Sequence, residues 1–144
     1  MPSTFSALHV HVIFSTKERL PLILAAWKDR LHGFMTSILI HRDVEPLAIG
    51  GVTDHVHLLL RLKPIHSPAE IVRELKSVTS KWIREERLDA AFAWQEGYGA
   101  ISVSPSNVRA VCRYIENQEE HHRGRTTEEE FQDFLKKVMA DSPR

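Results

Sequence analysis

The hydrophobic residues of this chain follow two different spacings, and each spacing predicts one kind of secondary structure. Alternation with a period of two predicts strands, and recurrence every three or four residues predicts helices. Strands are expected at residues 5–15, 44–52, 55–62 and 100–104. Helices are expected at residues 22–40, 68–87 and 108–122, and a last amphipathic helix is expected to begin at Thr126 or Thr127. The predicted order is therefore β-α-β-β-α-β followed by further helical sequence.

Capping signals support the starts of the second and third helices. Ser67 precedes Pro68, and Glu70 follows the serine by three residues, which is a capping box with proline at the first helical position. The segment Ser104-Pro105-Ser106-Asn107 is a second signal of this kind. Both signals come after predicted strands, so the chain is expected to alternate between a sheet and the helices that cover it.

This order of elements most simply builds a four-stranded antiparallel sheet with two helices on one face, because crossover connections are right-handed. We therefore predict an α+β fold of the ferredoxin-like type with additional C-terminal helices. In that plan, the first and third strands are neighbours at the centre of the sheet. The 144 residues are expected to form one domain, residues 1–144.

Composition and charge add only a few constraints. The hydrophobic content of 42% and the charged content of 26% are typical of a soluble globular protein. No apolar run is long enough to cross a membrane, and no signal peptide opens the chain. Cys112 is the only cysteine, so no internal disulfide is expected and a cytoplasmic location is predicted. The formal net charge of zero leaves room for a local nucleic-acid site but does not indicate one.

Two histidines in the third predicted strand form the first candidate for chemistry. His55 and His57 are two residues apart, so they point to the same side of the strand, and two neutral imidazoles can bind one metal ion. His9 and His11 form a similar pair in the first strand. Because these two strands are expected to be neighbours, the spacing alone leaves either pair open as the metal site.

A second candidate lies in the helix after the last strand. Tyr114 and Gln118 are four residues apart, so they are expected on one helix face. A tyrosine hydroxyl beside a divalent metal can attack a phosphodiester and form a phosphotyrosine. The amide oxygen of Gln118 can complete a His-His-Gln ligand set. Oxygen donors and open coordination positions suit Mg²⁺ or Mn²⁺ better than a closed zinc site.

Other residues have weaker functional interpretations. Asp54 is a candidate to orient an imidazole, although aspartate is equally expected in a tight turn. His121 is a candidate to contact a DNA phosphate or to bind the metal, but His121 and His122 are more typical of a solvated helix end. Tyr98 is the rival nucleophile, and with Trp94 it is a candidate for stacking on bases. Four basic residues share one helix with several glutamates, which is more typical of a solvent-exposed face with ion pairs than of a DNA track; they are Arg73, Lys76, Lys81 and Arg84.

The segment Asp54-His55-Val56-His57, preceded by Gly-Gly-Val-Thr, resembles the His-hydrophobic-His motif of the single-tyrosine HUH transposases. These are the small IS-two-hundred-like transposases, which include the repeat-associated tyrosine transposases. The likeness extends over most of the chain, through Phe14-Ser15-Thr16-Lys17, residues 50–60, Trp94-Gln95-Glu96-Gly97-Tyr98-Gly99-Ala100, Val103-Ser104-Pro105-Ser106-Asn107-Val108, and Tyr114-Ile115-Glu116-Asn117-Gln118 with the residues up to 122.

The resemblance implies roles for four residues. His55, His57 and Gln118 would bind the divalent metal, and Tyr114 would attack single-stranded DNA, often presented as a hairpin. The products would be a 5′-phosphotyrosine and a free 3′-OH, which a second strand can use to reverse the step. The family also implies a homodimer in which the tyrosine helix of one subunit completes the metal site of the other. His9 matches no motif of the family.

Two alternatives come from other functional classes. A non-catalytic nucleic-acid-binding module with a ferredoxin-like fold would need exposed aromatic residues on the central strands, where this chain has histidines. A phosphodiesterase that uses water would not need Tyr114. The two-histidine phosphoesterases carry paired His-x-Thr/Ser motifs, and neither histidine pair of this chain has that form.

Overall fold

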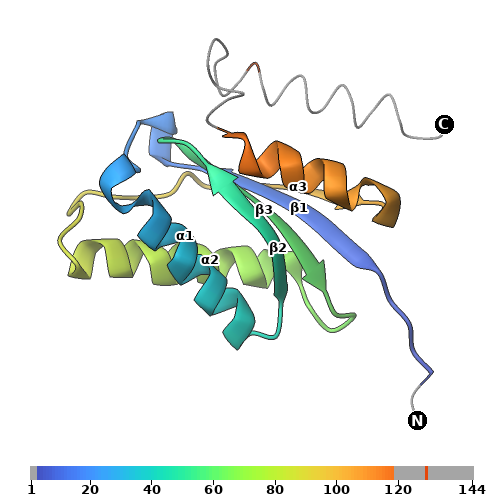
Figure 1. Cartoon of the computed structure of the whole chain (residues 1–144). Helices are drawn as coiled ribbons and strands as arrows, with labels where there is room; N and C mark the ends of the chain where they lie inside the picture. Colours follow the sequence, from blue (N-terminus) through green and yellow to red (C-terminus); the bar gives the residue numbers. More distant parts are fainter. Residues whose placement is uncertain (1–2, 119–128, 130–144) are drawn as a thin grey trace.

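The computed structural model describes residues 3–118 and residue 129. Within that range, an antiparallel four-stranded sheet has the order β2-β3-β1-β4 (Figure 1). The elements are β1 (Leu8–Ser15), α1 (Ala25–His41), β2 (Glu45–Gly51), β3 (His55–Leu62), α2 (Pro68–Glu85), β4 (Gly99–Val103) and α3 (Val108–Glu116), with short 3-10 helices at Lys17–Arg19 and Pro105–Asn107. This is the predicted α+β arrangement, with β1 and β3 adjacent at the centre.

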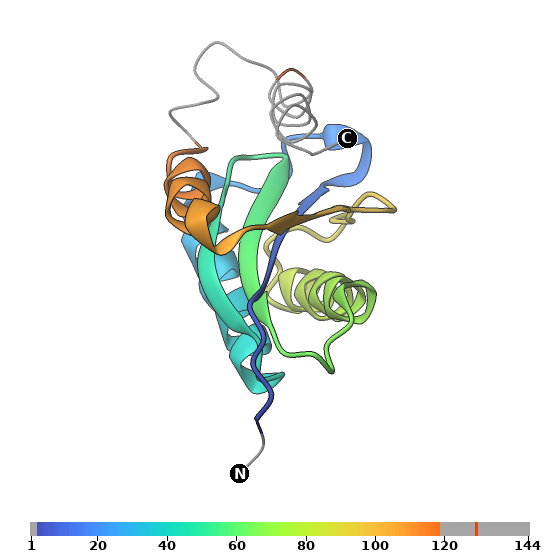
Figure 2. The same ribbon diagram turned by 90° about the vertical axis from the view of Figure 1, so that its right-hand side faces the viewer.

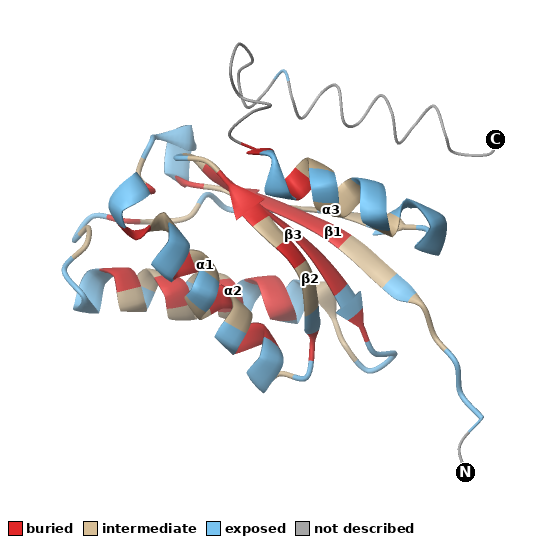
Figure 3. Ribbon diagram, in the orientation of Figure 1, coloured by how far each residue is buried: buried red, intermediate tan, exposed pale blue. Residues whose placement is uncertain are grey.

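Helices cover both faces of the sheet. Figure 2 shows α2 and α3 on opposite sides of the strands. The larger core joins α1 and α2 to alternate residues of the central strands, among them Val12, Phe14, Val56, Leu58 and Leu60. Figure 3 shows how strongly burial concentrates along β1 and β3. A strand that is buried on both faces needs an almost continuous apolar sequence. In β3 this sequence is the run Leu58-Leu59-Leu60.

The smaller cluster, on the other face, holds α3 against the sheet. Ile115 of α3 packs with Ala48 of β2 and Leu59 of β3. Gly50 permits this close approach, because a Cβ atom at this position would lie 2.0 Å from the carbonyl oxygen of Ile115. His55 and His57 alternate with Val56 and share the face of Leu59, so the histidines lie beneath α3.

The boundaries of several elements differ from the sequence prediction. β1 begins at Leu8, since Phe5 is 86% exposed and has no strand partner in the described region. α3 ends at Glu116 and not near residue 122, because Asn117 leaves the helical conformation with φ −102° and ψ 26°. His121 and the predicted last helix lie outside the described residues. Among the residues described, no helix is long and apolar enough to span a membrane.

Candidate metal and tyrosine site

The two histidines of β3 are buried and lie side by side. His55 is 2% exposed and His57 is 3% exposed, and their ring centroids are 4.8 Å apart. Strand alternation predicts this shared face, and the antiparallel pairing with β1 fixes it: Ser15 lies opposite His55 and Ile13 opposite His57. The pair is therefore held on a rigid central strand and not on a loop.

Each of these imidazoles has a hydrogen-bonding contact at Nδ1. His55 Nδ1 donates to Asp54 Oδ1 at 2.8 Å, the contact predicted for a carboxylate that orients the ring. His57 Nδ1 lies 2.9 Å from Nε2 of His11 on β1. When Nδ1 of a neutral imidazole carries the proton, Nε2 carries the lone pair that a metal requires. The two contacts therefore suit a site in which both histidines bind through Nε2.

Gln118 reaches the same place from the turn after α3. Its side chain is 1% exposed, and its Nε2 donates to the carbonyl oxygen of Tyr114 at 3.1 Å. This bond directs Oε1 toward His55, where it lies 3.2 Å from Nε2. The two residues were predicted to share one helix face, and they lie next to each other although α3 ends at Glu116 and Asn117 forms a turn before Gln118.

The donor set fits a divalent metal. A neutral His55 that donates from Nδ1 presents a lone pair at Nε2, and Gln118 Oε1 is also an acceptor, so a cation between them would satisfy both atoms. Residues 3–118 and 129 contain no group of three His, Cys, Asp or Glu side chains that could hold a metal. A metal here would therefore depend on the glutamine oxygen, and a mixed nitrogen and oxygen set leaves positions for substrate.

Tyr114 lies beside the histidines of its own chain. The side chain is half-buried on α3, and its ring centroid is 5.6 Å from that of His57, with the planes at 80°. It is 6.2 Å from the ring of His11, again edge to face. The nucleophile and ligands that the resemblance implies are therefore neighbours, although they come from sequence positions about sixty residues apart.

His11 is the residue of this cluster that the family motifs did not mark. It is fully buried, and burial lowers its pKa from 6.5 to about 4, so its imidazole is neutral at pH 7. Only one sequence signal pointed to His11: it shares a strand face with His9, on a strand that was expected to lie beside the third strand. His9, two residues earlier, lies opposite Arg61 and Val103 and is only half-buried.

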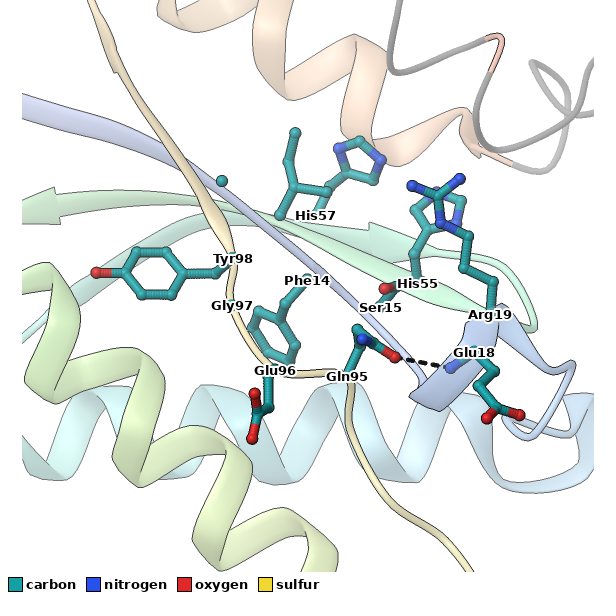
Figure 4. Close-up of a pocket in the computed structure, with 12 residues that line it drawn as sticks. Phe14, Ser15, Glu18, Arg19, His55, His57, Gln95, Glu96, Gly97 and Tyr98 are labelled. Carbon is teal, nitrogen blue, oxygen red and sulfur yellow. Dashed lines mark hydrogen bonds between the residues drawn. The ribbon is translucent and has the colours of Figure 1, made fainter.

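A cavity of about 510 Å³ opens beside His55 and His57 (Figure 4). Its walls come from the end of β1, the 3-10 helix at Lys17–Arg19 and the loop before β4. Lys76 Nζ donates to the carbonyl oxygens of Gln95 and Gly97 at 2.7 and 2.6 Å and so holds this loop. The ring of Tyr98 points away from the histidines in Figure 4, which makes it poorly placed as the rival nucleophile.

Side-chain contacts bear on two of the weaker sequence interpretations. Trp94 does not offer a stacking surface, because its ring packs against Phe14 and Phe92 with centroids 4.9 Å away and its Nε1 donates to Thr79 Oγ1. The basic side chains of α2 include members with structural partners: Lys76 binds the loop, Lys81 pairs with Glu85, and Arg84 donates to the carbonyl of Phe92.

Comparison with known proteins identifies the family and the fold of this chain. Residues 4–118 match the family model described as Transposase IS200 like. A structure assigned as a transposase from Deinococcus radiodurans R1 is 25% identical, with a TM-score of 0.66 over 82% of this chain and 95% of the other. A repeat-associated (REP) tyrosine transposase, solved bound to a REP hairpin, has the same fold: it is 14% identical with a TM-score of 0.58, over 80% of this chain and 68% of the other.

A search of curated proteins finds no match. The family match alone spans well over half of the chain, and it includes the histidine pair of β3, Tyr114 and Gln118. The chain therefore belongs to the IS200-like transposase family.

Proposed function

We propose that this transposase cuts and rejoins single-stranded DNA through a covalent bond to Tyr114, with Mg²⁺ or Mn²⁺ bound by His55, His57 and Gln118. The observation that carries the proposal is the convergence of these four side chains, from β3 and from the end of α3, beneath one helix. A non-catalytic binding module has no need for a buried histidine pair facing an amide oxygen.

The chain's own residues would prepare the site before DNA arrives. Asp54 holds the His55 ring by its Nδ1 proton, and the bond from Gln118 to the backbone of Tyr114 holds the amide oxygen toward His55. When bound, the metal supplies Lewis-acid polarisation of the phosphodiester and neutralises charge on its oxygens. Tyr114 is coupled to this ligand set through the same turn, because Gln118 donates to its carbonyl.

The proposed step exchanges one phosphodiester for another. The phenolic oxygen of Tyr114 attacks phosphorus and loses its proton to solvent, while the bond between phosphorus and the 3′ oxygen breaks and the departing oxygen takes up a proton. The products are a 5′-phosphotyrosine and a free 3′-OH. Because the bond energy is retained, a 3′-OH from another strand can attack the phosphotyrosine and release Tyr114. This reversal would join the strands without water or a nucleotide cofactor.

Two observations support single-stranded DNA with a hairpin as the substrate. The fold is that of a REP-associated tyrosine transposase solved with a REP hairpin. The cavity beside His55 and His57 is about 510 Å³ in volume, which can admit part of a nucleotide next to the metal site. A zero net charge gives the protein little general attraction to DNA, so recognition of a specific structure is needed.

The test is a denaturing gel of 3′-end-labelled single-stranded DNA from the flanks of the protein's own gene, incubated with Mn²⁺. The label should migrate with the wild-type protein as a covalent adduct. Tyr114→Phe keeps the ring and its packing but removes the attacking oxygen, so DNA binding should remain and the adduct should disappear. Tyr98→Phe is the matched control and should form the adduct normally. Cleavage without an adduct would favour the water-using phosphodiesterase instead.

A further inference from the structure

We propose that His11 is a positioning residue that holds His57 in the orientation and tautomer needed to bind the metal. This inference rests on the proposed function and extends it to a residue outside the set implied by the family. The observation is the buried contact of 2.9 Å between His11 Nε2 and His57 Nδ1, which joins the two central strands of the sheet.

The register of the sheet explains why the two side chains meet. His11 lies opposite Leu59 and His57 lies opposite Ile13, so the two histidines are diagonal neighbours across β1 and β3 on one face. Diagonal positions are within reach of long side chains. The ring centroids are 5.1 Å apart with an angle of 34° between the planes. Both residues are at most 3% exposed.

The surroundings restrict movement of this pair. Tyr114 packs edge to face on both rings, with centroid distances of 5.6 Å to His57 and 6.2 Å to His11. The ring of His55 also packs against that of His57, with the centroids 4.8 Å apart. A rotation of the His57 ring would therefore break the contact with His11 and also disturb its packing against Tyr114, so the ring orientation is defined by its neighbours.

In this proposal the proton of the contact belongs to His57, which fixes one tautomer of its ring. A neutral imidazole has a single N–H; when the Nδ1 proton of His57 is donated to His11, the lone pair of His57 is at Nε2 and available to a metal. In this arrangement the neutral imidazole of His11 accepts the Nδ1 proton of His57, as the carboxylate of Asp54 accepts that of His55 at 2.8 Å. Each ligand histidine thus has its own Nδ1 acceptor from a different part of the chain.

A rival role for His11 is that of a third metal ligand. Ligation through Nε2, which already contacts His57, would require loss of the 2.9 Å contact. The two roles predict different numbers of bound imidazoles. Two coordinated nitrogens are expected for positioning, and three are expected for ligation.

The experiment measures Mn²⁺ binding, which does not depend on catalysis. Free Mn²⁺ is quantified by electron paramagnetic resonance during titration of the wild type, His11→Leu, His11→Gln and His9→Leu, after each variant has been shown to be folded by circular dichroism. His11→Leu should weaken binding about 10- to 100-fold, the usual effect of losing the partner of a ligand histidine. His11→Gln retains an acceptor and should recover most of the affinity. His9→Leu, on the same strand face, should match the wild type.

Electron spin echo spectroscopy of the Mn²⁺-loaded wild type gives a second measurement that needs no variant, and it should detect two coordinated histidine nitrogens. Three would overturn the positioning role, as would wild-type affinity in a folded His11→Leu or a His11→Gln that binds as weakly as the leucine variant. If the wild type binds no Mn²⁺, the proposed function fails and the inference fails with it. If only the His11 variants behave differently from expectation, the inference alone fails.

Discussion

At the scale of single residues, the centre of the site is a pair of acceptor atoms, His55 Nε2 and Gln118 Oε1, 3.2 Å apart. Because His55 donates its Nδ1 proton to Asp54, neither of these two atoms carries a proton for the other. A cation bound between them would stabilise their close approach. This geometry supports the proposal that the amide oxygen of Gln118 binds the metal. Its neighbour Asn117 is exposed and provides a comparison in the same turn.

We predict that Gln118→Ala weakens Mn²⁺ binding at least about tenfold, because it removes the oxygen that lies 3.2 Å from Nε2 of His55. His55→Ala and His57→Ala should each weaken it as much or more. Calorimetric titration with Mn²⁺ measures these effects, and Asn117→Ala is the control with unchanged affinity. Equal affinity in the Gln118→Ala and Asn117→Ala proteins would exclude Gln118 from the ligand set.

His32 on α1 supports a prediction about pH and stability. Burial, with a smaller effect of Lys28 and an opposing effect of Asp29, lowers its pKa from 6.5 to about 4. Between these values the unfolded chain binds a proton that the folded chain does not, so the free energy of unfolding falls as the pH falls through this window. Between pH 7 and pH 5, wild type should lose about 1–2 kcal/mol more than His32→Gln in urea unfolding. Identical losses in both proteins would contradict this origin.

At the scale of elements, the position of α3 decides whether the tyrosine and the glutamine reach the histidines. The helix rests on β2 through Ile115, and Gly50 leaves room for the carbonyl of that residue. The following turn then places Gln118 over β3. A small change in the packing of α3 should therefore be felt in metal binding. Gly50 is also the cross-strand neighbour of His57, so a shift of its backbone would reach the histidine pair as well.

Gly50→Ala places a methyl group 2.0 Å from the Ile115 carbonyl oxygen, so α3 must shift. We predict a loss of about 1–3 kcal/mol in the free energy of unfolding, together with weaker Mn²⁺ binding. Gly33→Ala is the matched control on α1, where an added Cβ meets nothing within 4 Å. That variant should be as stable as wild type or up to about 1 kcal/mol more stable, since alanine favours helix. Unchanged stability and metal affinity in Gly50→Ala would refute the packing argument.

At the scale of the whole molecule, we predict a homodimer, as the resemblance to single-tyrosine transposases implies. Sedimentation at micromolar concentration should give the mass of two chains, whereas an active monomer would contradict the prediction. Within one chain, the ring centroid of Tyr114 already lies 5.6 Å from that of His57. Mixing a Tyr114→Phe subunit with a His55→Ala subunit tests how the sites are shared: recovered adduct formation shows that a tyrosine helix completes the partner's metal site, and its absence shows that each chain uses its own tyrosine.

The local parts of this protein follow from the order of its residues. The predicted strand at 55–62 matches β3 at both ends, and Ser67 caps α2 by accepting from the Glu70 backbone N–H at 3.3 Å. Alternation places His55 and His57 on one face, because a strand has a period of two. The central pairing of β1 with β3 follows from the order of elements and the handedness of the connections.

Other features depend on distances between segments that no local pattern contains. α3 covers the face of the sheet opposite α1 and α2, and it ends two residues before Gln118, so the helix is interrupted at Asn117. His11 meets His57 because the register sets them diagonally on adjacent strands, whereas His9, with the same parity and spacing, remains two residues further along the strand. Side-chain periodicity selects a face, but only packed tertiary structure decides which side chains on that face come within hydrogen-bonding distance.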